Sequence, residues 1–222
     1  MKIEYVLTPE DRRWMRVARA ALDIELRVRA SLREAPPHVG AQLDPAPPLF
    51  FEAARALMSR LPTASVVLCR GCLEATLHAA LVRMNLGNRR FALRISPAGS
   101  RSGLFPGLAF LLRESVSSGI LGASLSRSAW LIKEDGDFSA HLAARRDSGM
   151  LTSSVTRRDT LTGLTTWKPV RLWVGESRAL SNLRVMERIL RRVTQRARDV
   201  SALSPAAQIL RLSRMPLVPR SE

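Results

Sequence analysis

Aromatic side chains are scarce in this chain of 222 residues, where they make up 5% of the total. Proteins that hold single-stranded nucleic acid usually stack bases on aromatic rings, so this scarcity disfavours a stacking platform. Lysine is rarer still, because only Lys2, Lys133 and Lys168 among the 35 basic residues are lysine and the rest are arginine. The hydrophobic share of 46% excludes wholesale disorder and predicts a buried core.

Cysteine is limited to Cys69 and Cys72, which form a single Cys-Arg-Gly-Cys. A redox motif of this kind is expected at a strand-to-helix turn in a βαβ pattern, and nothing nearby completes that pattern. A zinc site would need two further ligands, for which only His78 and His141 are available. We therefore expect two buried, reduced thiols, no metal site and no cofactor.

Long apolar runs and leader signals are also missing. No uninterrupted apolar run approaches the roughly 18 to 20 residues of a membrane span, and Met1–Arg13 lacks the apolar core of a signal peptide. There is no internal repeat, no phosphate-binding glycine loop and no nucleophile elbow. These absences predict a soluble, cytoplasmic protein without membrane association.

The charge is strongly one-sided, with a formal net charge of +16 and a sequence pI near 11.6. Such a field attracts nucleic acid, RNA above all, or an acidic protein, and makes the binding salt-dependent. A GC-rich genome also produces chains rich in alanine, arginine and leucine. Functional charge and coding bias are both open at this stage.

Helical patterns dominate the chain. Thr8-Pro9-Glu10-Asp11 is a strong helix start, with a hydroxyl cap, a proline in the first turn and acids at the positive end of the dipole. Further helices are predicted over 49–60, 62–87, 104–118, 120–135 and 176–202. Prolines in 35–48 predict an extended linker, and the Thr- and Val-rich segment 151–174 predicts a β-hairpin.

These elements suggest three parts. Residues 1–48 hold the first helix and its Pro-rich linker, residues 49–203 form a helical domain with an insertion at about 145–175, and residues 204–222 form a tail. Polar groups concentrate in Leu131–His141. Gly136 is expected to end the preceding helix, and Asp137 and Ser139 to cap the next one, so that Lys133, Asp137 and His141 converge. A helix boundary with polar caps and no further role explains the same residues.

A second motif lies in Ser65–Leu81, where Arg70, Glu74 and His78 recur every four residues on one helical face. Arg70 and Glu74 could form no more than a local helix pair. Together with Lys133, Gly136, Asp137, Ala140 and His141, however, they resemble the HEPN-like family of prokaryotic restriction and defence proteins. That family has an Arg-x-x-x-Glu helix followed by Arg-x-x-Gly-Asn-x-x-Ala-His, so Lys133 replaces an arginine here and Asp137 an asparagine.

The resemblance covers about residues 60 to 202 and implies an antiparallel helical bundle, which is mainly α. It also implies a nucleic-acid-associated module of a defence system, with a homodimer and a defence-system protein as possible partners. Some HEPN proteins are metal-independent ribonucleases. In that alternative His141 would transfer the proton, Lys133 would offset phosphorane charge and Asp137 would orient one of them, with Arg70 and Glu74 in support.

The arginines expected to contact nucleic acid lie outside this motif. The helix predicted over 176–202 has one apolar stripe, and arginines follow its other side. The loop after residue 87 is also basic. The residues predicted to bind nucleic acid are Arg184, Arg188, Arg191, Arg89 and Arg90. A third alternative is a structural helical protein whose charge is neutralised within a ribonucleoprotein or protein assembly.

Overall fold

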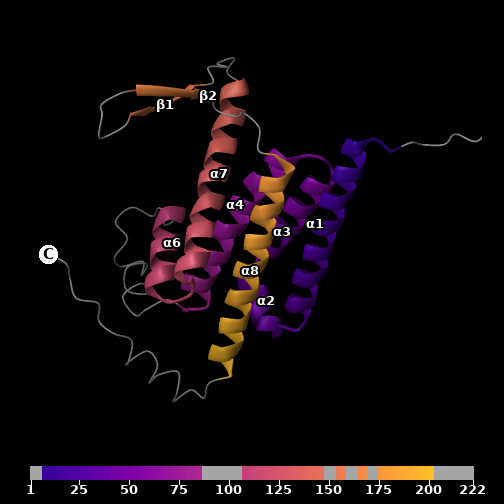
Figure 1. Cartoon of the computed structure of the whole chain (residues 1–222). Coiled ribbons are helices and arrows are strands. Elements are labelled where there is room, and N and C mark those ends of the chain that lie inside the picture. Colours follow the sequence, from indigo (N-terminus) through magenta and orange to yellow (C-terminus); the bar gives the residue numbers. More distant parts are fainter. Residues whose placement is uncertain (1–6, 87–106, 148–153, 159–164, 170–174, 203–222) are drawn as a thin grey trace, which may run out of the picture.

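The structure is a computed structural model that describes residues 7–86, 107–147, 154–158, 165–169 and 175–202 (Figure 1). These parts are mainly helical and form a bundle, which confirms the predicted fold class at that level. The helices are α1 (Pro9–Arg33), α2 (Pro37–Leu43), α3 (Ala46–Met58), α4 (Pro62–His78), the π-helical turn η1 (Ala79–Arg83), α6 (Leu108–Ser117), α7 (Ala123–Asp147) and α8 (Glu176–Ser201).

The start of α1 is the one that the sequence predicts. The Thr8 hydroxyl accepts a hydrogen bond from the Asp11 backbone N–H at 3.1 Å, and the Asp11 carboxylate accepts one from the Thr8 N–H at 3.2 Å. This reciprocal pair satisfies two amides at the helix end, and Pro9 occupies the first turn, where it costs no hydrogen bond.

The prediction of an extended, Pro-rich linker over 35–48 is wrong, because this segment is largely helical. Pro37 begins α2, and Pro47 and Pro48 lie in the first turn of α3. Proline is tolerated there because first-turn amides have no partner within the helix. The segment is also anchored by apolar burial, since Val39, Leu43 and Ala46 are fully buried. The first helix and the rest of the bundle therefore share one core.

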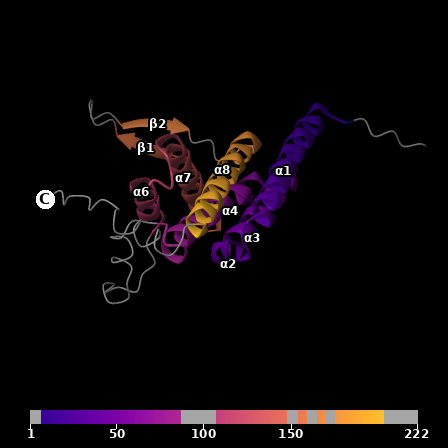
Figure 2. The same ribbon diagram turned by 90° about the horizontal axis from the view of Figure 1, so that it is seen from below.

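The centre of the bundle is α4, which packs against α3, α7 and α8 (Figures 1 and 2). Its continuation η1 follows without a break. By length and composition alone, the helical segment Pro62–Arg83 could cross a membrane, although the sequence has no uninterrupted apolar run of that length. About 56% of its apolar window is buried against the other helices. A central core helix passes the same test, so this feature is explained by packing.

The second half of the bundle follows the predicted hairpin of helices. Gly119 joins α6 to α7 with φ at +66°, a conformation that glycine adopts at no steric cost. The last helix, α8, has nearly the predicted bounds, and it lies beside α1 in the same direction. Arg27 contacts Glu187, and further along both helices Arg198 contacts Ser31.

Two short strands, β1 (Ser154–Arg158) and β2 (Thr165–Pro169), pair antiparallel, with Thr156 opposite Trp167. Residues 148–153, 159–164 and 170–174 around them lie outside the described residues. The insertion that the sequence predicts over 145–175 therefore stays a prediction, as does the proposed tail over 204–222.

Candidate functional site

Four charged side chains form a cluster between α4 and α7. The Asp137 carboxylate accepts a hydrogen bond from Arg70 Nε through one oxygen and from Lys133 Nζ through the other, the latter at 2.6 Å. Arg70 also lies 3.3 Å from a Glu74 oxygen. Two cations and two carboxylates thus balance each other in what we call the Asp137 cluster, made of Arg70, Glu74, Lys133 and Asp137.

The side chains of the Asp137 cluster are between 22% and 38% exposed. Burial by itself would raise the pKa of Asp137. The hydrogen bonds from Lys133 and Arg70, with their positive charges, outweigh burial and hold this pKa below its ordinary value. Asp137 is therefore ionised at neutral pH, and its charge is committed to the two cations.

Gly136 does not end a helix, and this prediction is wrong. The α-helix runs through it from Ala123 to Asp147. Gly136 is buried, and an added Cβ would lie 2.7 Å from Arg70 Cδ and 2.9 Å from Arg70 Cγ. The glycine is needed because α4 and α7 cross closely at this point. It follows that Asp137 and Ser139 are not caps, since both lie inside α7.

His141 lies in α7, one helical turn after Asp137. Its side chain is outside what the structure describes, so its convergence with Lys133 and Asp137 stays a prediction. The structure does bring Arg70, Glu74, Lys133 and Asp137 together. Among the ion pairs of the described residues, Arg70 is the α4 residue that reaches α7, and Glu74 is linked to it through Arg70.

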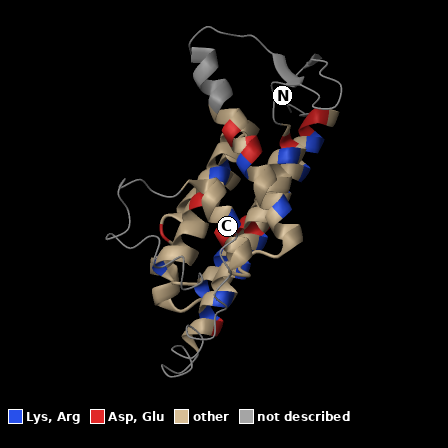
Figure 3. Cartoon of the chain, turned by 90° about the vertical axis from the view of Figure 1, so that its left-hand side faces the viewer, with Lys and Arg blue, Asp and Glu red and all other residues tan. Residues whose placement is uncertain are grey.

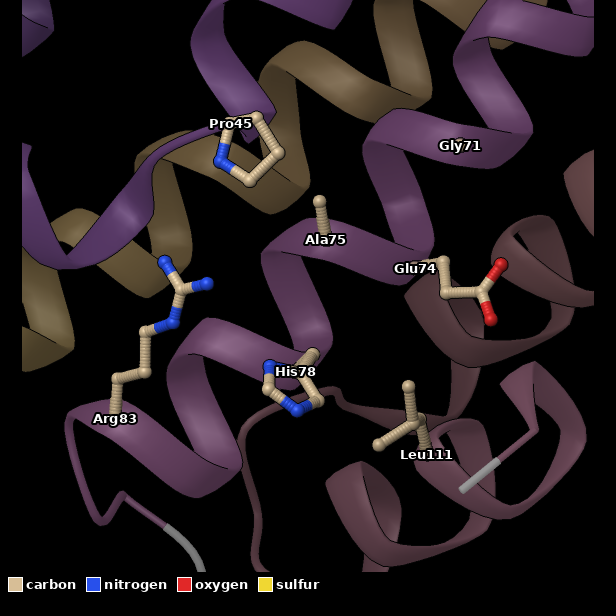
Figure 4. A pocket seen from close by; sticks show the side chains of 7 residues that line it. All are labelled: Pro45, Gly71, Glu74, Ala75, His78, Arg83 and Leu111. Carbon is tan, nitrogen blue, oxygen red and sulfur yellow. The ribbon is translucent and has the colours of Figure 1, made fainter. Parts of the chain in front are cut away.

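Glu74 of the Asp137 cluster also lines a pocket of about 320 Å³ (Figure 4). Its lining residues are Pro45, Gly71, Glu74, Ala75, His78, Arg83 and Leu111. In Figure 4 the His78 ring lies lower in the view than the Glu74 carboxylate to its right and the Arg83 guanidinium to its left. Burial and the positive charge of Arg83 lower the pKa of His78, so the imidazole is neutral at neutral pH.

Arg83 is the last residue of the π-helical turn η1, which no pattern in the sequence predicts. In η1 the Met84 N–H donates to the Ala79 carbonyl at 2.9 Å, five residues back. A wide turn of this kind rotates the following residues backward relative to an α-helix. The Arg83 guanidinium then donates to the backbone carbonyl of Asp44, and at 3.4 Å to that of Gln42. This contact ties η1 to the end of α2.

The predicted nucleic-acid-binding residues on α8 form an exposed row. Arg184, Arg188 and Arg191 are exposed, and so is Arg192, which is not among the predicted residues. Arg191 lies 3.8 Å from a Glu187 oxygen. Among the described residues, Arg184, Arg188 and Arg192 form no ion pair. Arg89 and Arg90 lie outside the described residues.

Ion pairs hold α8 on both sides, and they are not among the predicted site contacts. Arg27 of α1 binds Glu187 through two hydrogen bonds of 2.6 and 3.0 Å. Arg178 binds Asp135 of α7 in the same paired manner, at 2.6 and 3.1 Å, and the hydrogen bonds to Asp135 raise the pKa of Arg178. Pairs between helices have no sequence spacing that could reveal them. Figure 3 shows basic residues down the length of the described helices, with acidic residues among them.

Cys69 and Cys72 are buried and free, as expected. Burial raises the pKa of Cys72 to about 12 and that of Cys69 well above its ordinary value. Within the described ranges, no three side chains of histidine, cysteine, aspartate or glutamate come together as metal ligands.

Comparison with known proteins found no matching family model, no similar curated protein and no similar solved structure.

Proposed function

We propose that this chain is a nucleic-acid-binding helical module that contacts RNA through the exposed arginine row of α8. The observation that carries the proposal is the contrast between two groups of cations. Arg70 and Lys133 are committed to Asp137, whereas Arg184 and Arg188 are exposed and form no ion pair with any described residue. Free guanidinium groups bind phosphate oxygens well, because their planar fork matches two oxygens at once.

The length of the arginine row and its fixed position on the bundle also favour binding. Arg184 and Arg191 are seven residues apart, so the row extends about 10 Å along the helix at roughly 1.5 Å per residue. Glu187 and Arg178 fix α8 to the helices on either side. A rigid row loses little conformational entropy on binding, apart from that of the arginine side chains. The net charge of +16 adds long-range attraction for a polyanion.

The HEPN-like assignment, with a role in a prokaryotic restriction or abortive-infection system, is part of this proposal. Its support is the pair of short motifs, whose members Arg70, Glu74, Lys133 and Asp137 are in contact. A homodimer or a defence-system protein would then be a natural partner.

A metal-independent ribonuclease is the second candidate. The proximity of Lys133 and Asp137 to the helix position of His141 favours it. The internal charge balance of the Asp137 cluster argues against it, because the carboxylates of Asp137 and Glu74 already neutralise both cations and so weaken their attraction for a phosphorane.

The experiment is a fluorescence-anisotropy titration of a labelled RNA over a range of salt concentrations. Arg184→Glu with Arg188→Glu should weaken binding by roughly tenfold or more and flatten the salt dependence. The matched control is Arg113→Glu with Arg127→Glu, which makes the same charge change at exposed positions on α6 and α7. Equal losses of affinity in both double variants would mean that RNA binding depends on the net charge and not on the arginine row of α8. No loss in either would refute the proposal.

A further inference from the structure

The outer face of α1 carries large apolar side chains that no described element covers. Met15 is 47% exposed, Leu22 44% and Leu26 54%. The buried side of the same helix packs through Ala21, Ile24 and Val28. These three exposed residues therefore belong to a second face, in addition to the one that the bundle uses.

Their spacing is that of a helix-pairing seam. Met15, Leu22 and Leu26 are separated by seven and then four residues, which keeps them within a narrow strip of the helix surface. Continuing the alternation of three and four residues along α1 gives the full seam, which we call the α1 seam: Arg12, Met15, Arg19, Leu22, Leu26, Arg29 and Arg33. Strips of this period accept a second helix by knobs-into-holes packing.

The charges of the α1 seam indicate what that helix must be. Arg12, Arg19 and Arg33 are exposed and form no ion pair among the residues that the structure describes. Arg29 is bound to Glu25 and stacks over the Phe51 ring at 4.0 Å. A partner helix would thus meet three half-exposed apolar side chains flanked by free guanidinium groups.

We propose that the α1 seam docks an acidic amphipathic helix of a partner protein. Such a helix would place apolar residues opposite Met15, Leu22 and Leu26 and glutamates opposite Arg12 and Arg19. Amphipathic helices that bind a surface in this way are recognised through anchors at similar spacing. This surface is separate from the arginine row of α8, so the proposal goes beyond the RNA-binding function.

Other occupants fit the α1 seam less well. A second copy of this chain would bring its arginines against the same arginines, which is repulsive. An anionic membrane would be attracted by the arginines, but membrane binding scales with buried apolar area, and three partly exposed side chains offer little of it.

The test uses the full-length chain and two fluorescent peptides of about four heptads each. One has seam positions in the order Glu-Leu-Glu-Leu-Leu-Glu-Glu, and the other has the reverse order, so that both helix directions are covered. Their scrambled versions keep composition and charge. We expect one patterned peptide to bind at least tenfold more tightly than its scrambled version.

Leu22→Ser with Leu26→Ser should weaken binding of the patterned peptide by at least tenfold, and so should Arg12→Glu with Arg19→Glu. The matched control is Leu131→Ser on α7, where the leucine is similarly exposed at 43%. This variant should bind as the wild type does, and circular dichroism checks that each variant keeps its helices.

Equal binding of the patterned and scrambled peptides, or an unchanged affinity in the Leu22 and Leu26 variant, would overturn the proposal. So would a failure of both patterned peptides to bind below about 100 µM. If sedimentation equilibrium shows a dimer for the wild type and a monomer for the Leu22 and Leu26 variant, the seam would be assigned to a second copy. Binding to anionic vesicles that is lost in this variant, without peptide binding, would assign it to a membrane.

Discussion

The side chain of Arg70 on α4 lies directly over the backbone of Gly136 on α7. The close approach is what allows Arg70 to reach the Asp137 carboxylate, one residue further along α7. Any side chain at position 136 would meet the first carbons of Arg70, which are fixed near the backbone and cannot swing away.

Gly136→Ala should destabilise the protein, although alanine favours a helix over glycine by roughly 1 kcal/mol. The added Cβ overpacks the α4–α7 contact, which typically costs about 1 to 3 kcal/mol. Urea unfolding measures the net loss. Gly40→Ala in α2 is the control, because no atom of the described residues lies within 4 Å of a Cβ there, and it should be neutral or slightly stabilising. An equally stable Gly136→Ala protein would contradict the close approach.

Asp137→Asn should lower the free energy of unfolding at pH 7 by about 1 kcal/mol, because it leaves Arg70 and Lys133 without their shared carboxylate and the cluster is partly exposed. The pKa of Asp137 is depressed in the folded state, so its stabilisation is present above the unfolded pKa near 4 and is lost as the pH falls through the folded value. Urea unfolding at several pH values should therefore show the wild type and the variant converging at acid pH. A constant difference would mean that the charge of Asp137 is not responsible.

His141→Ala separates the binding module from the ribonuclease. We expect the purified wild-type chain not to cleave RNA in the presence of EDTA, since Lys133 and Arg70 are both paired with Asp137. RNA binding should then be the same in His141→Ala. Gel assays with labelled RNA measure both properties. Cleavage that His141→Ala reduces by about 100-fold or more, at an unchanged melting temperature, would favour the enzyme. In that case Lys133→Arg should preserve or raise the rate.

Asp135→Ala should destabilise the protein by about 1 to 3 kcal/mol, because Arg178 and Asn182 of α8 both donate to this carboxylate and lose it together. Asp199→Ala is the control, since the one described residue that donates to Asp199 is exposed Gln195, in the same helix. Thermal unfolding of both variants gives the comparison. Equal effects would indicate that the α7–α8 contact does not depend on Asp135.

Cys69 and Cys72 should not react with a disulfide reagent at pH 8 in the folded protein, because burial raises both pKa values and excludes the reagent. Two thiols should react after unfolding in guanidinium chloride. The reaction is followed by the absorbance of the released thiolate. Rapid reaction of the native protein would reopen the redox interpretation of Cys-Arg-Gly-Cys.

Local signals in the sequence predicted the helices well. The cap at Thr8 and Pro9 and the apolar period of 176–202 identify α1 and α8 because both signals act within a few residues. The prolines of 35–48 led to the wrong prediction of an extended linker. A proline breaks the interior of a helix, but in the first turn it removes no helical hydrogen bond. Gly136 led to the wrong prediction of a helix end. A glycine at a helix end and a glycine at a close helix crossing look the same in the sequence, and only the contact with Arg70 on the other helix distinguishes them.

The candidate site was predictable only in part. Arg70, Glu74, Lys133 and Asp137 were selected from two short motifs, and the structure brings them together. The contact between Arg70 and Asp137 that joins the two motifs could not be predicted, because it depends on how α4 crosses α7. The π-helical turn that ends at Arg83 could not be predicted either, because nothing in its sequence distinguishes it from a continuing α-helix.

The pairing of α1 with α8 has a consequence for synthesis of the chain on the ribosome. Glu187, the buried partner of Arg27, is translated 160 residues after it. At roughly 5 to 20 residues per second, the side of α1 that faces α8 waits on the order of ten seconds or more for its partner. During that interval the nascent chain exposes apolar surface that the finished protein covers, and such surface favours aggregation until α8 has been made.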